Sequence, residues 1–478
     1  MAYKLRKKDI SSNKSVPRLR IAVKLKNLPP DKELRGLEGL GNLVFRLLPL
    51  IDSLDPKQFN ELRERALEMM EKARQMIDKT LRTDPQTKLP DFSYWHQIIC
   101  PKELPPDDLV RALRKSELVE TAYVMRPVPP PFPPPVNGAN RDPNQGYLDP
   151  APDGIDALYA WSKGGDGDGI RFVDMEQGWN LEHEDLAAAR ITLISGVNHD
   201  YFWHGTSALG EVLMDDNNTV GGVGIAPRAR AAVVSQWRKD GSYDYKDPDS
   251  FNTASAIFSA LDNMKFGDVL LLEAQEDAEL GSEPGNNVPG PWPVEIADGT
   301  YAALEWAKAL GIVVIEAAGN GAHDLENSSQ TSSGKKIFDQ NSPDFRDSGA
   351  IMVGAASSAS PHARLLFSNY GKRIDCYAWG ENIETTDSND AGNDSTAYRP
   401  DFDGTSGASP IIAGAALIIQ GLAKASPLGR PFFPQELRRI LTNGTFSENS
   451  SPQNPNADGI GVMPNLQAII DANRLARV

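Results

Sequence analysis

Short apolar runs separated by longer amphipathic stretches dominate the chain from residue 169 onward. Runs that are apolar on both faces are typical of strands buried in a parallel sheet with helices on both sides. Such sheets gather their chemistry at the carboxyl ends of the strands. The pattern predicts an α/β fold with a doubly wound, mostly parallel sheet, and its strands are expected at 169–173, 231–234, 269–272, 312–315 and 350–353.

The first part of the chain follows a different pattern. Apolar and polar residues alternate over 21–26, as in a half-buried strand. Asp55 and Pro56 are a good N-cap and first-turn pair, and apolar residues then recur at helical spacing from Phe59 to Met76. The remaining predicted elements are a strand at 94–99, a helix at 107–115 and a strand at 119–125.

A proline-rich stretch separates the two patterns. Seven of the nine residues in 127–135 are prolines, a composition that favours an extended spacer and excludes a helix or a central strand. A ligand for a partner that binds proline-rich segments is the alternative to a linker. The sequence therefore predicts a smaller α+β domain at 1–126, a linker with a processing site at 127–146 and an α/β domain at 147–478.

Charge is divided unevenly between these parts. Residues 1–126 hold 25 Lys and Arg against 18 Asp and Glu, a balance of +7. Subtraction from the whole-chain totals of 49 and 65 leaves 24 against 47, or −23, for the rest. Opposite charges favour contact between a basic front segment and an acidic body. The alternative for the basic run 4–26 is a tail that binds nucleic acid or membrane, and we expect no nucleic-acid partner.

Cysteine content and targeting signals add little to the prediction of function. The chain has two cysteines, Cys100 and Cys376, so no disulfide framework can be inferred, and neither lies in the small-residue turn of a thiol nucleophile. Residues 1–20 are basic but lack the apolar core of a secretory signal. No apolar stretch is long enough to span a membrane. We expect a cytoplasmic protein or one exported by a non-classical route.

A predicted helix start at Ser406 is the first candidate for chemistry. The segment Gly404-Thr-Ser-Gly-Ala-Ser-Pro410 precedes an apolar, alanine-rich stretch that predicts a buried helix. At a helix start, unpaired backbone N–H groups and the positive end of the dipole favour a developing oxyanion. The alternative is that Thr405 or Ser406 is only the N-cap.

A serine hydroxyl needs a neighbouring base, and the base needs a third group to orient it. His204 opens the small-residue segment that ends at Gly210, at a predicted helix start where a base can face the serine. Asp174 directly follows the predicted strand, so it is the predicted acid that holds the imidazole. A satisfied core histidine and a helix-capping aspartate are the alternatives.

Asn320 supplies a fourth signal. It follows the strand 312–315 and a run of small residues, and its amide can donate to an oxyanion alongside the backbone N–H of Ser406. An ordinary Asn-Gly turn is the alternative. Because all four motifs lie at strand ends or helix starts, the sequence predicts the catalytic triad Asp174, His204 and Ser406, with Asn320 in the oxyanion hole.

Together these motifs resemble those of the subtilisin-like serine peptidases, in which acid, base and nucleophile follow in this order. The resemblance covers about residue 147 to the end, and it includes the stretches 217–227, 365–371, 374–380 and 459–466. It implies a serine endopeptidase that cleaves proteins or peptides through an acyl-enzyme and needs no cofactor. Calcium often stabilises this family, but no Asp-x-Asn-x-Asp-Gly loop occurs, so no metal is assigned.

The resemblance also implies a role for residues 18–126. Many family members are zymogens with an N-terminal prodomain of ferredoxin-like fold, which assists folding and then blocks the cleft as an intramolecular inhibitor. The predicted strands and helices are similar to that plan, and the extra length from Leu34 to Thr83 resembles an inserted helical elaboration. A segment that recruits a partner and is never removed is the alternative.

For substrate binding, the resemblance implies an edge that pairs with an extended peptide by strand addition. The family usually has Ser-Leu-Gly-Gly where this chain has Glu273-Ala-Gln-Glu276, so Gln275 and Glu276 are expected to narrow the S1 entrance. Acidic neighbours at 277, 279 and 283 predict a preference for Lys or Arg near the scissile bond, with a solvated acidic loop as the alternative. The expected substrate-binding residues are Leu272, Glu273, Ala274, Gln275, Ala317, Ala318 and Gly319.

Three other functions are compatible with the same residues. A catalytically silent binding module would keep the fold and use its cleft for recognition, and a transpeptidase would release the acyl-enzyme to an amine. A metal-dependent hydrolase would use His183, His199 and His204 with Asp174, although the spacing from His199 to His204 does not place both on one helical face.

Overall fold

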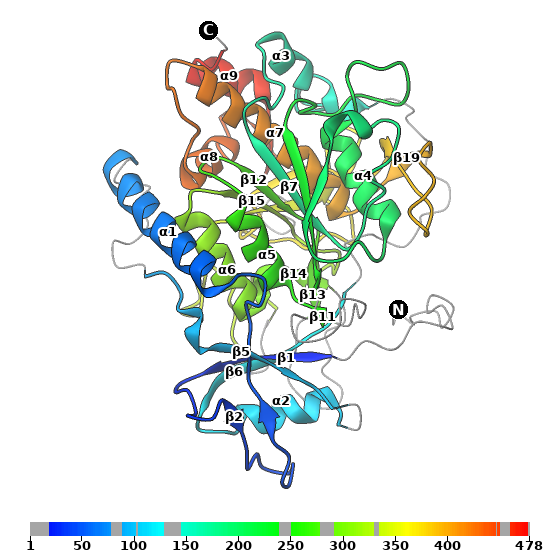
Figure 1. Cartoon of the computed structure of the whole chain (residues 1–478). Helices are drawn as coiled ribbons and strands as arrows, with labels where there is room; N and C mark the ends of the chain where they lie inside the picture. Colours follow the sequence, from blue (N-terminus) through cyan, green and yellow to red (C-terminus); the bar gives the residue numbers. More distant parts are fainter. Residues whose placement is uncertain are drawn as a thin grey trace.

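A nine-stranded sheet forms the centre of the larger part of the molecule (Figure 1). Along the sheet the order is β20-β21-β17-β16-β15-β12-β7-β9-β8; all neighbours are parallel except β20 and β21. The strands are β7 (Arg171–Glu176), β8 (Thr192–Ser195), β9 (Arg230–Ser235), β12 (Val269–Leu272), β15 (Val313–Ala317), β16 (Ile351–Ala356), β17 (Cys376–Trp379), β20 (Ser447–Asn449) and β21 (Val462–Pro464). The computed structural model describes residues 19–77, 88–101, 104–128, 145–238, 250–277, 291–328, 334–445, 447–449 and 459–476.

Helices cover both faces of this sheet, which confirms the predicted α/β fold and its doubly wound, mostly parallel sheet. One face packs against α5 and α6, and the other packs against α4 and α7. All five predicted strands are present, with small shifts at their ends. The helices of this part are α3 (Ala157–Ser162), α4 (Phe202–Leu213), α5 (Thr253–Asp262), α6 (Asp298–Ala309), α7 (Thr405–Ala425), α8 (Pro434–Leu441) and α9 (Leu466–Asn473).

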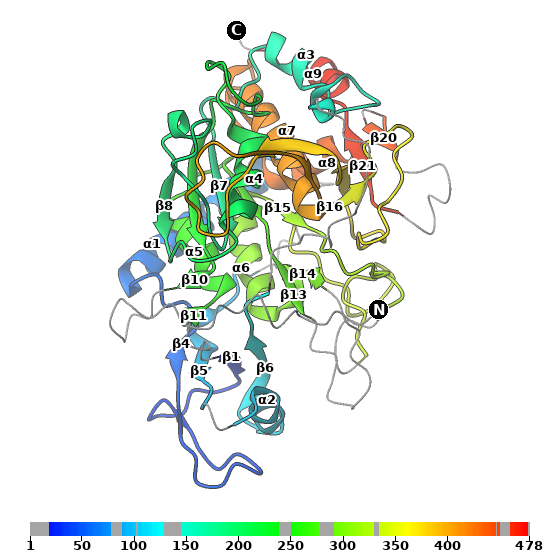
Figure 2. The same ribbon diagram turned by 90° about the vertical axis from the view of Figure 1, so that its right-hand side faces the viewer.

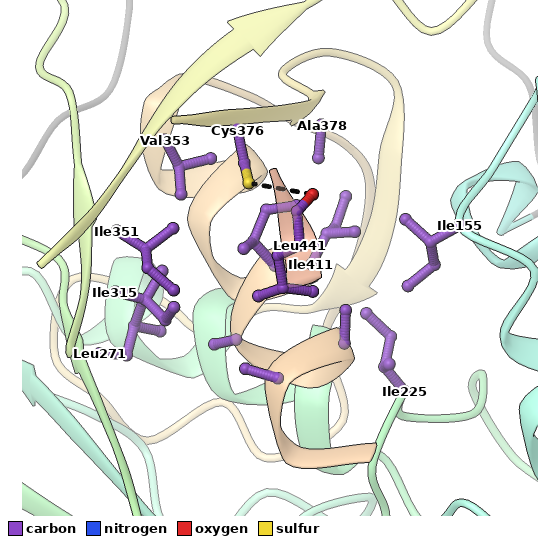
Figure 3. Packing of buried hydrophobic residues seen from close by; sticks show 14 of the residues in the cluster. Ile155, Ile225, Leu271, Ile315, Ile351, Val353, Cys376, Ala378, Ile411 and Leu441 are labelled. Atoms are coloured by element: carbon purple, nitrogen blue, oxygen red, sulfur yellow. Dashed lines mark hydrogen bonds between the residues drawn. The ribbon is translucent and has the colours of Figure 1, made fainter. Parts of the chain in front are cut away.

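Helix α7 runs through the main hydrophobic core. Figure 3 shows Ile411 on this helix among side chains from the strands, including Ile315, Val353 and Cys376. The thiol of Cys376 is fully buried, and burial raises its pKa well above the usual range, as expected for a packing residue and not for a nucleophile. Within the described residues, α7 is the one helix long and apolar enough to cross a membrane, and its apolar stretch is buried inside the fold.

Strand β7 is longer at its carboxyl end than the sequence predicts. It continues past Val173 to Glu176. Phe172 packs on the α4 and α7 face, whereas Val173 and Met175 pack on the α5 and α6 face. Because side chains alternate between the faces of a strand, Asp174 and Glu176 share the face of Phe172. Two acidic side chains therefore point toward the helices α4 and α7.

Four strands between residues 20 and 125 form a second, smaller sheet at the opposite end of the molecule from α3 and α9 (Figures 1 and 2). Its order is β4-β5-β1-β6, and helix α2 covers it. The strand order is that of the expected ferredoxin-like fold, although β4 contributes only two residues. The elements are β1 (Arg20–Leu25), β4 (Leu48–Pro49), β5 (Trp95–Ile99), α2 (Pro106–Arg114) and β6 (Val119–Met125), together with the hairpin of β2 (Glu33–Leu34) and β3 (Phe45–Arg46).

The remaining short strands form three separate two-stranded sheets. They are the paired strands β10 (Trp237–Arg238) and β11 (Ser250–Phe251), β13 (Gln275–Asp277) and β14 (Pro291–Pro293), and β18 (Ile383–Thr386) and β19 (Tyr398–Phe402). The boundaries of the three predicted domains stay a prediction, and residues 129–144 of the proline-rich linker lie outside the described residues.

The long helix α1 (Pro56–Met76) packs on the larger part and not on the small sheet. It begins at the predicted N-cap, since the Asp55 side chain accepts hydrogen bonds from the N–H groups of Lys57 and Gln58. Leu62 and Ala66 are fully buried in a cluster that also contains residues of α5 and α6. Figure 1 shows α1 lying beside α6. The predicted helical elaboration therefore joins the two parts of the molecule.

We predict that Leu62→Ala lowers the free energy of unfolding by about 2–5 kcal/mol, because it opens a cavity in this shared core. Chemical denaturation of the full chain measures the change. Leu67→Ala is the matched control on the same helix, because Leu67 is 42 % exposed, and it is expected to change stability by no more than about 0.5 kcal/mol. Equal effects of the two substitutions would contradict a shared core at α1.

Candidate active site

A hydrogen bond between His204 and Glu176 lies at the centre of the site. His204 is in the first turn of α4, and Glu176 is the last residue of β7. The distance from His204 Nδ1 to Glu176 Oε1 is 2.7 Å, and both side chains are fully buried. A carboxylate bonded to one ring nitrogen fixes the tautomer of the imidazole and leaves Nε2 to exchange a proton.

Asp174 does not hold this histidine, so the predicted acid is corrected to Glu176. Oδ2 of Asp174 accepts a hydrogen bond of 2.7 Å from Trp179 Nε1. Asp174 is fully buried; desolvation raises its pKa well above the usual range, and the neighbouring Glu176 raises it further. The prediction was wrong because it ended the strand at Val173, whereas three more residues carry the carboxyl end of β7 to Glu176.

The sequence contained a signal for Glu176 that the prediction did not use. Alternation places Asp174 and Glu176 on the same face of a strand, so the rule of carboxyl-end chemistry applies to whichever of them ends it. Gly178 follows two residues later, and a Cβ atom there would lie 2.4 Å from the carbonyl oxygen of Asp200. This required glycine marks the turn that follows the strand, and it would have indicated Glu176.

The residue after His204 explains how α4 reaches the strand end. A Cβ atom on Gly205 would lie 2.4 Å from the Gly178 carbonyl oxygen and 2.6 Å from the ring of Trp179. Only glycine lets the helix start pack this closely against the turn. The rings of Trp203 and Phe402 also contact the imidazole edge-on, with centroids 5.4 Å away in each case. His204 is therefore held by packing as well as by its hydrogen bond.

Ser406 lies in the first turn of α7, as predicted from the small residues around it. The helix begins after Gly404, whose φ of +95° is unfavourable for residues with a side chain. The Ser406 hydroxyl is buried and forms no hydrogen bond to any described residue. Helices α4 and α7 pack together, and Glu273 connects their starts, because one of its oxygens lies within 4.8 Å of a ring nitrogen of His204 and its Oε1 contacts Ser409. Catalytic hydrogen bonds often form only when substrate is bound.

Asn320 follows β15 and faces the start of α7. Its Oδ1 accepts hydrogen bonds from the backbone N of Thr405 at 3.0 Å and from Thr405 Oγ1 at 2.9 Å. Its Nδ2 is buried and donates to no described residue. This amide group therefore has a fixed orientation and an unused donor beside the turn that contains Ser406, which is the arrangement predicted for an oxyanion hole.

The predicted substrate-binding edge is largely occupied by the protein itself. Leu272 is paired on both sides, with Met175 of β7 and Glu316 of β15. Ala317 pairs with Val353 of β16. Strand addition needs an unpaired edge, so Leu272 does not bind a substrate strand, and one side of Ala317 is already taken by β16.

The residues after β15 are also bonded internally. Ala318 N donates to the Val353 carbonyl at 2.9 Å, and the Ala318 carbonyl accepts from Asn369 Nδ2 at 2.6 Å. Gly319 N donates to Thr405 Oγ1 at 3.2 Å, and its carbonyl accepts from Asn369 N at 3.0 Å. Neither residue has the backbone groups free for strand addition, so the prediction for Ala318 and Gly319 is corrected as well.

The segment after β12 differs from the expected substrate-binding wall. Gln275 begins β13, which pairs antiparallel with β14, a strand of the same chain. Ala274 is buried. Glu273 is fully buried and hydrogen-bonds to Ser409, so it does not belong to an acidic substrate surface. Residues 279 and 283 of that predicted surface lie outside the described residues.

Glu273 instead belongs to a cluster of buried acids around the histidine. One ligand atom each of Glu176, His204 and Glu273 lie within 4.8 Å of one another, a spacing that would also suit a metal ion. Oε1 of Glu176 is engaged by His204 Nδ1, and Oε1 of Glu273 contacts Ser409. We interpret the group as hydrogen-bonded side chains.

The histidines of the alternative metal site do not gather around His204. His183 Nε2 lies 2.8 Å from the carbonyl oxygen of Ala397, and its Nδ1 accepts from the N–H of Asp185. The ring of His199 packs on Trp237, with centroids 4.7 Å apart. The arrangement predicted for a metal hydrolase is therefore absent from the described residues.

The chain that leaves the smaller sheet passes next to the acid of the site. Gln177 directly follows Glu176, and its Nε2 donates to the carbonyl oxygen of Val128 at 2.6 Å. Val128 is buried and lies three residues after the end of β6. The last described residue of the small domain is thus bonded to the residue that follows the acid of the site.

Known proteins with similar sequences are proteases. The family model described as the subtilase family matches residues 196–461. An intracellular serine protease of Paenibacillus polymyxa is 28 % identical, over 65 % of this chain and 85 % of that protein. An extracellular basic protease of Dichelobacter nodosus is 27 % identical, over 57 % of this chain and 38 % of that protein. The chain thus spans well under half of that relative's length.

A solved structure gives a weaker match. A cold-adapted subtilisin-like serine proteinase aligns with a TM-score of 0.41 and 21 % sequence identity, and the alignment covers 62 % of this chain and 88 % of that one.

We predict that His204 has a strongly downfield Nδ1–H proton resonance, because a buried carboxylate accepts that proton in a short bond. Glu176→Gln is expected to move this resonance upfield, whereas Asp174→Asn is expected to keep it. Proton NMR of the full chain, with histidine labelled with nitrogen-15, checks both. The opposite pattern would restore Asp174 as the partner of His204.

Proposed function

Because the chain belongs to the subtilase family, we propose that it is a serine endopeptidase with Glu176, His204 and Ser406 as its catalytic triad. The observation that carries the proposal is the 2.7 Å hydrogen bond between His204 and Glu176, with both side chains fully buried. A buried carboxylate on a histidine, near a serine at the start of a buried helix, suits nucleophilic catalysis.

In the proposed reaction, His204 takes the proton of the Ser406 hydroxyl as the serine oxygen attacks a peptide carbonyl. Glu176 stabilises the imidazolium that forms and does not itself take the proton. His204 then protonates the leaving amine, and a water molecule resolves the acyl-enzyme by the same route. None of these steps requires a cofactor.

The amide of Asn320 stabilises the oxyanion in this proposal. Its Oδ1 is held by two hydrogen bonds from Thr405, so its Nδ2 is oriented before substrate arrives. The backbone N–H of Ser406 supplies the second donor, at the start of a helix whose dipole favours negative charge. A pre-oriented donor loses little free energy to reorganisation when the intermediate forms.

We also propose that the chain is made as a zymogen, with residues 1–126 as its prodomain and intramolecular inhibitor. The Val128 carbonyl accepts a hydrogen bond from the side chain of Gln177, the residue after Glu176, so the end of the smaller domain contacts the chain next to the proposed acid. The side chains of Glu176, His204 and Ser406 are all fully buried, so substrate access requires a change in this state. Proteins or peptides are the proposed substrates.

We predict that a fluorophosphonate probe labels the processed enzyme and that Ser406→Ala abolishes labelling, because the serine is the nucleophile. Glu176→Gln is expected to lower kcat about 10³–10⁴-fold, as loss of a triad carboxylate does elsewhere. Asp174→Asn is the matched control and is expected to change kcat less than about tenfold.

Labelling is measured by mass spectrometry and kcat with a peptide substrate, each with and without a chelator. A chelator is expected to have no effect on the chemistry. Absence of labelling in a processed, folded protein would contradict the proposal and favour a silent binding module.

We predict that Asn320→Ala lowers kcat about 10²–10³-fold with little change in KM, because the donor acts on the transition state. Steady-state kinetics measures the separate changes in kcat and KM. Asn327→Ala is the control, since this exposed asparagine bonds only within its own turn. A change in KM alone would contradict the role of Asn320 in the oxyanion hole.

A further inference from the structure

A second buried glutamate lies beside the proposed triad, and the mechanism does not use it. We propose that Glu273 is a positioning residue that stays protonated in the active enzyme and donates a hydrogen bond to Ser409. This inference rests on the proposed peptidase function. Glu273 directly follows β12, and its side chain is fully buried.

The hydrogen bonds of Ser409 indicate where the proton is. The Ser409 hydroxyl contacts two oxygens, Oε1 of Glu273 and, at 2.7 Å, the carbonyl oxygen of Thr405. A backbone carbonyl can only accept, and a serine hydroxyl has one proton to donate. If that proton goes to Thr405, the proton of the other contact must come from Glu273. A protonated Glu273 therefore satisfies both contacts, whereas an ionised one leaves one of them unmet.

The other oxygen of Glu273 agrees with a neutral group. Oε2 is buried and accepts no hydrogen bond from any described residue. An ionised carboxylate in an apolar interior needs donors or a cation to offset its desolvation. Among the described residues, no ion pair joins Glu273 to a lysine or an arginine. The free oxygen fits the carbonyl of a protonated acid.

The surrounding charges favour the same state. Asp174 and Glu176 face Glu273 from β7, and His204 and Glu211 face it from α4. His204 is the one member of this group that can become positive. Desolvation raises the pKa of Glu273 well above the usual range, and the charge of Glu176 raises it further. Several buried like charges in one site cannot all be ionised.

Glu176 and not Glu273 is the ionised member of the pair. Burial raises the pKa of Glu176 too, but the backbone N–H of Gln177 hydrogen-bonds to it and opposes this shift. It also contacts Nδ1 of His204, which donates when the ring is in the catalytic tautomer. Among the described residues, Glu273 hydrogen-bonds only to the Ser409 hydroxyl, whose single proton the Thr405 carbonyl also accepts, so the proton of the pair resides on Glu273.

The proton on Glu273 is connected to the proposed oxyanion hole. Glu273 bonds to Ser409, Ser409 to the carbonyl of Thr405, and Thr405 to Oδ1 of Asn320 through both its N–H and its hydroxyl. Thr405 also directly precedes Ser406. Ionised Glu273 would draw the Ser409 proton away from Thr405 and so disturb the turn that holds nucleophile and oxyanion donor. Activity is therefore expected to fall as the pH rises through the pKa of Glu273.

The first test does not depend on activity. Infrared difference spectra of the full-length Ser406→Ala protein at neutral pH are expected to contain the carbonyl band of a buried protonated carboxyl group, and Glu273→Gln is expected to remove part of it. Glu61→Gln is the control, because the Glu61 side chain on α1 is exposed and cannot contribute to the band of a buried carboxyl group. An unchanged band in Glu273→Gln would overturn the inference even if the peptidase function holds.

The second test uses the pH–rate profile of the processed enzyme. Glu273→Ala is expected to lower kcat at least tenfold, and Glu273→Gln is expected to restore most of it, because an amide keeps the donor to Ser409. The alkaline decline of wild-type kcat is expected to be lost in Glu273→Gln and kept in Glu211→Gln. Equal loss in Glu273→Ala and Glu273→Gln would mean that an ionised carboxylate is needed, and would overturn the inference.

Discussion

The active-site arrangement depends on one interaction between groups that can carry charge and are buried away from water, the hydrogen bond of Glu176 and His204. Glu176 and His204 are both fully buried, and a lone ion in such a place would be strongly unfavourable. Their hydrogen bond makes the burial tolerable, and burial in turn strengthens the bond because the local dielectric is low. A long carboxylate side chain at the end of β7 spans the gap to the imidazole, while Asp174 stays bound to Trp179.

Around Glu176 and His204, the fold brings the first turns of α4 and α7 to the carboxyl end of β7. Gly205 lets α4 approach the turn after β7, and Gly404 lets α7 begin abruptly. Helix α7 is apolar on all sides because it runs through the core, with side chains of the sheet around it (Figure 3). Rigid burial of this helix holds Ser406 and Thr405 in place, which a surface helix could not do as well.

The smaller part of the molecule is joined to the larger one mainly by apolar packing. Leu62 and Ala66 of α1 share a cluster with Phe258 and Trp306, and Phe59 stacks on Phe258 at 5.7 Å. Polar contacts support this interface, among them the bond from Asn252 Nδ2 to the Leu50 carbonyl at 2.8 Å. Shared apolar burial of this kind couples the folding of two units, and it suits a segment that must form together with the domain it covers.

The sequence by itself determined the elements whose signals are local. Alternating and helical periodicity predicted β1, α1, β6 and the five central strands, and small residues before an apolar run predicted the helix of Ser406. Motif chemistry also pointed to His204 and Asn320, which hydrogen-bond to Glu176 and to Thr405 in the structure. These features depend on neighbours within a few residues, so a linear pattern contains the information needed to find them.

Tertiary structure alone decided which groups meet across the chain. The partner of His204 depended on where β7 ends, and a shift of two residues on one face exchanged Asp174 for Glu176. The pairing of β13 with β14 removed the expected substrate edge, and the approach of α7 to β12 turned Glu273 from a surface residue into a buried one. Distance and burial between remote segments set these contacts, and apart from the glycine that marks the turn after Glu176 no local pattern encodes them.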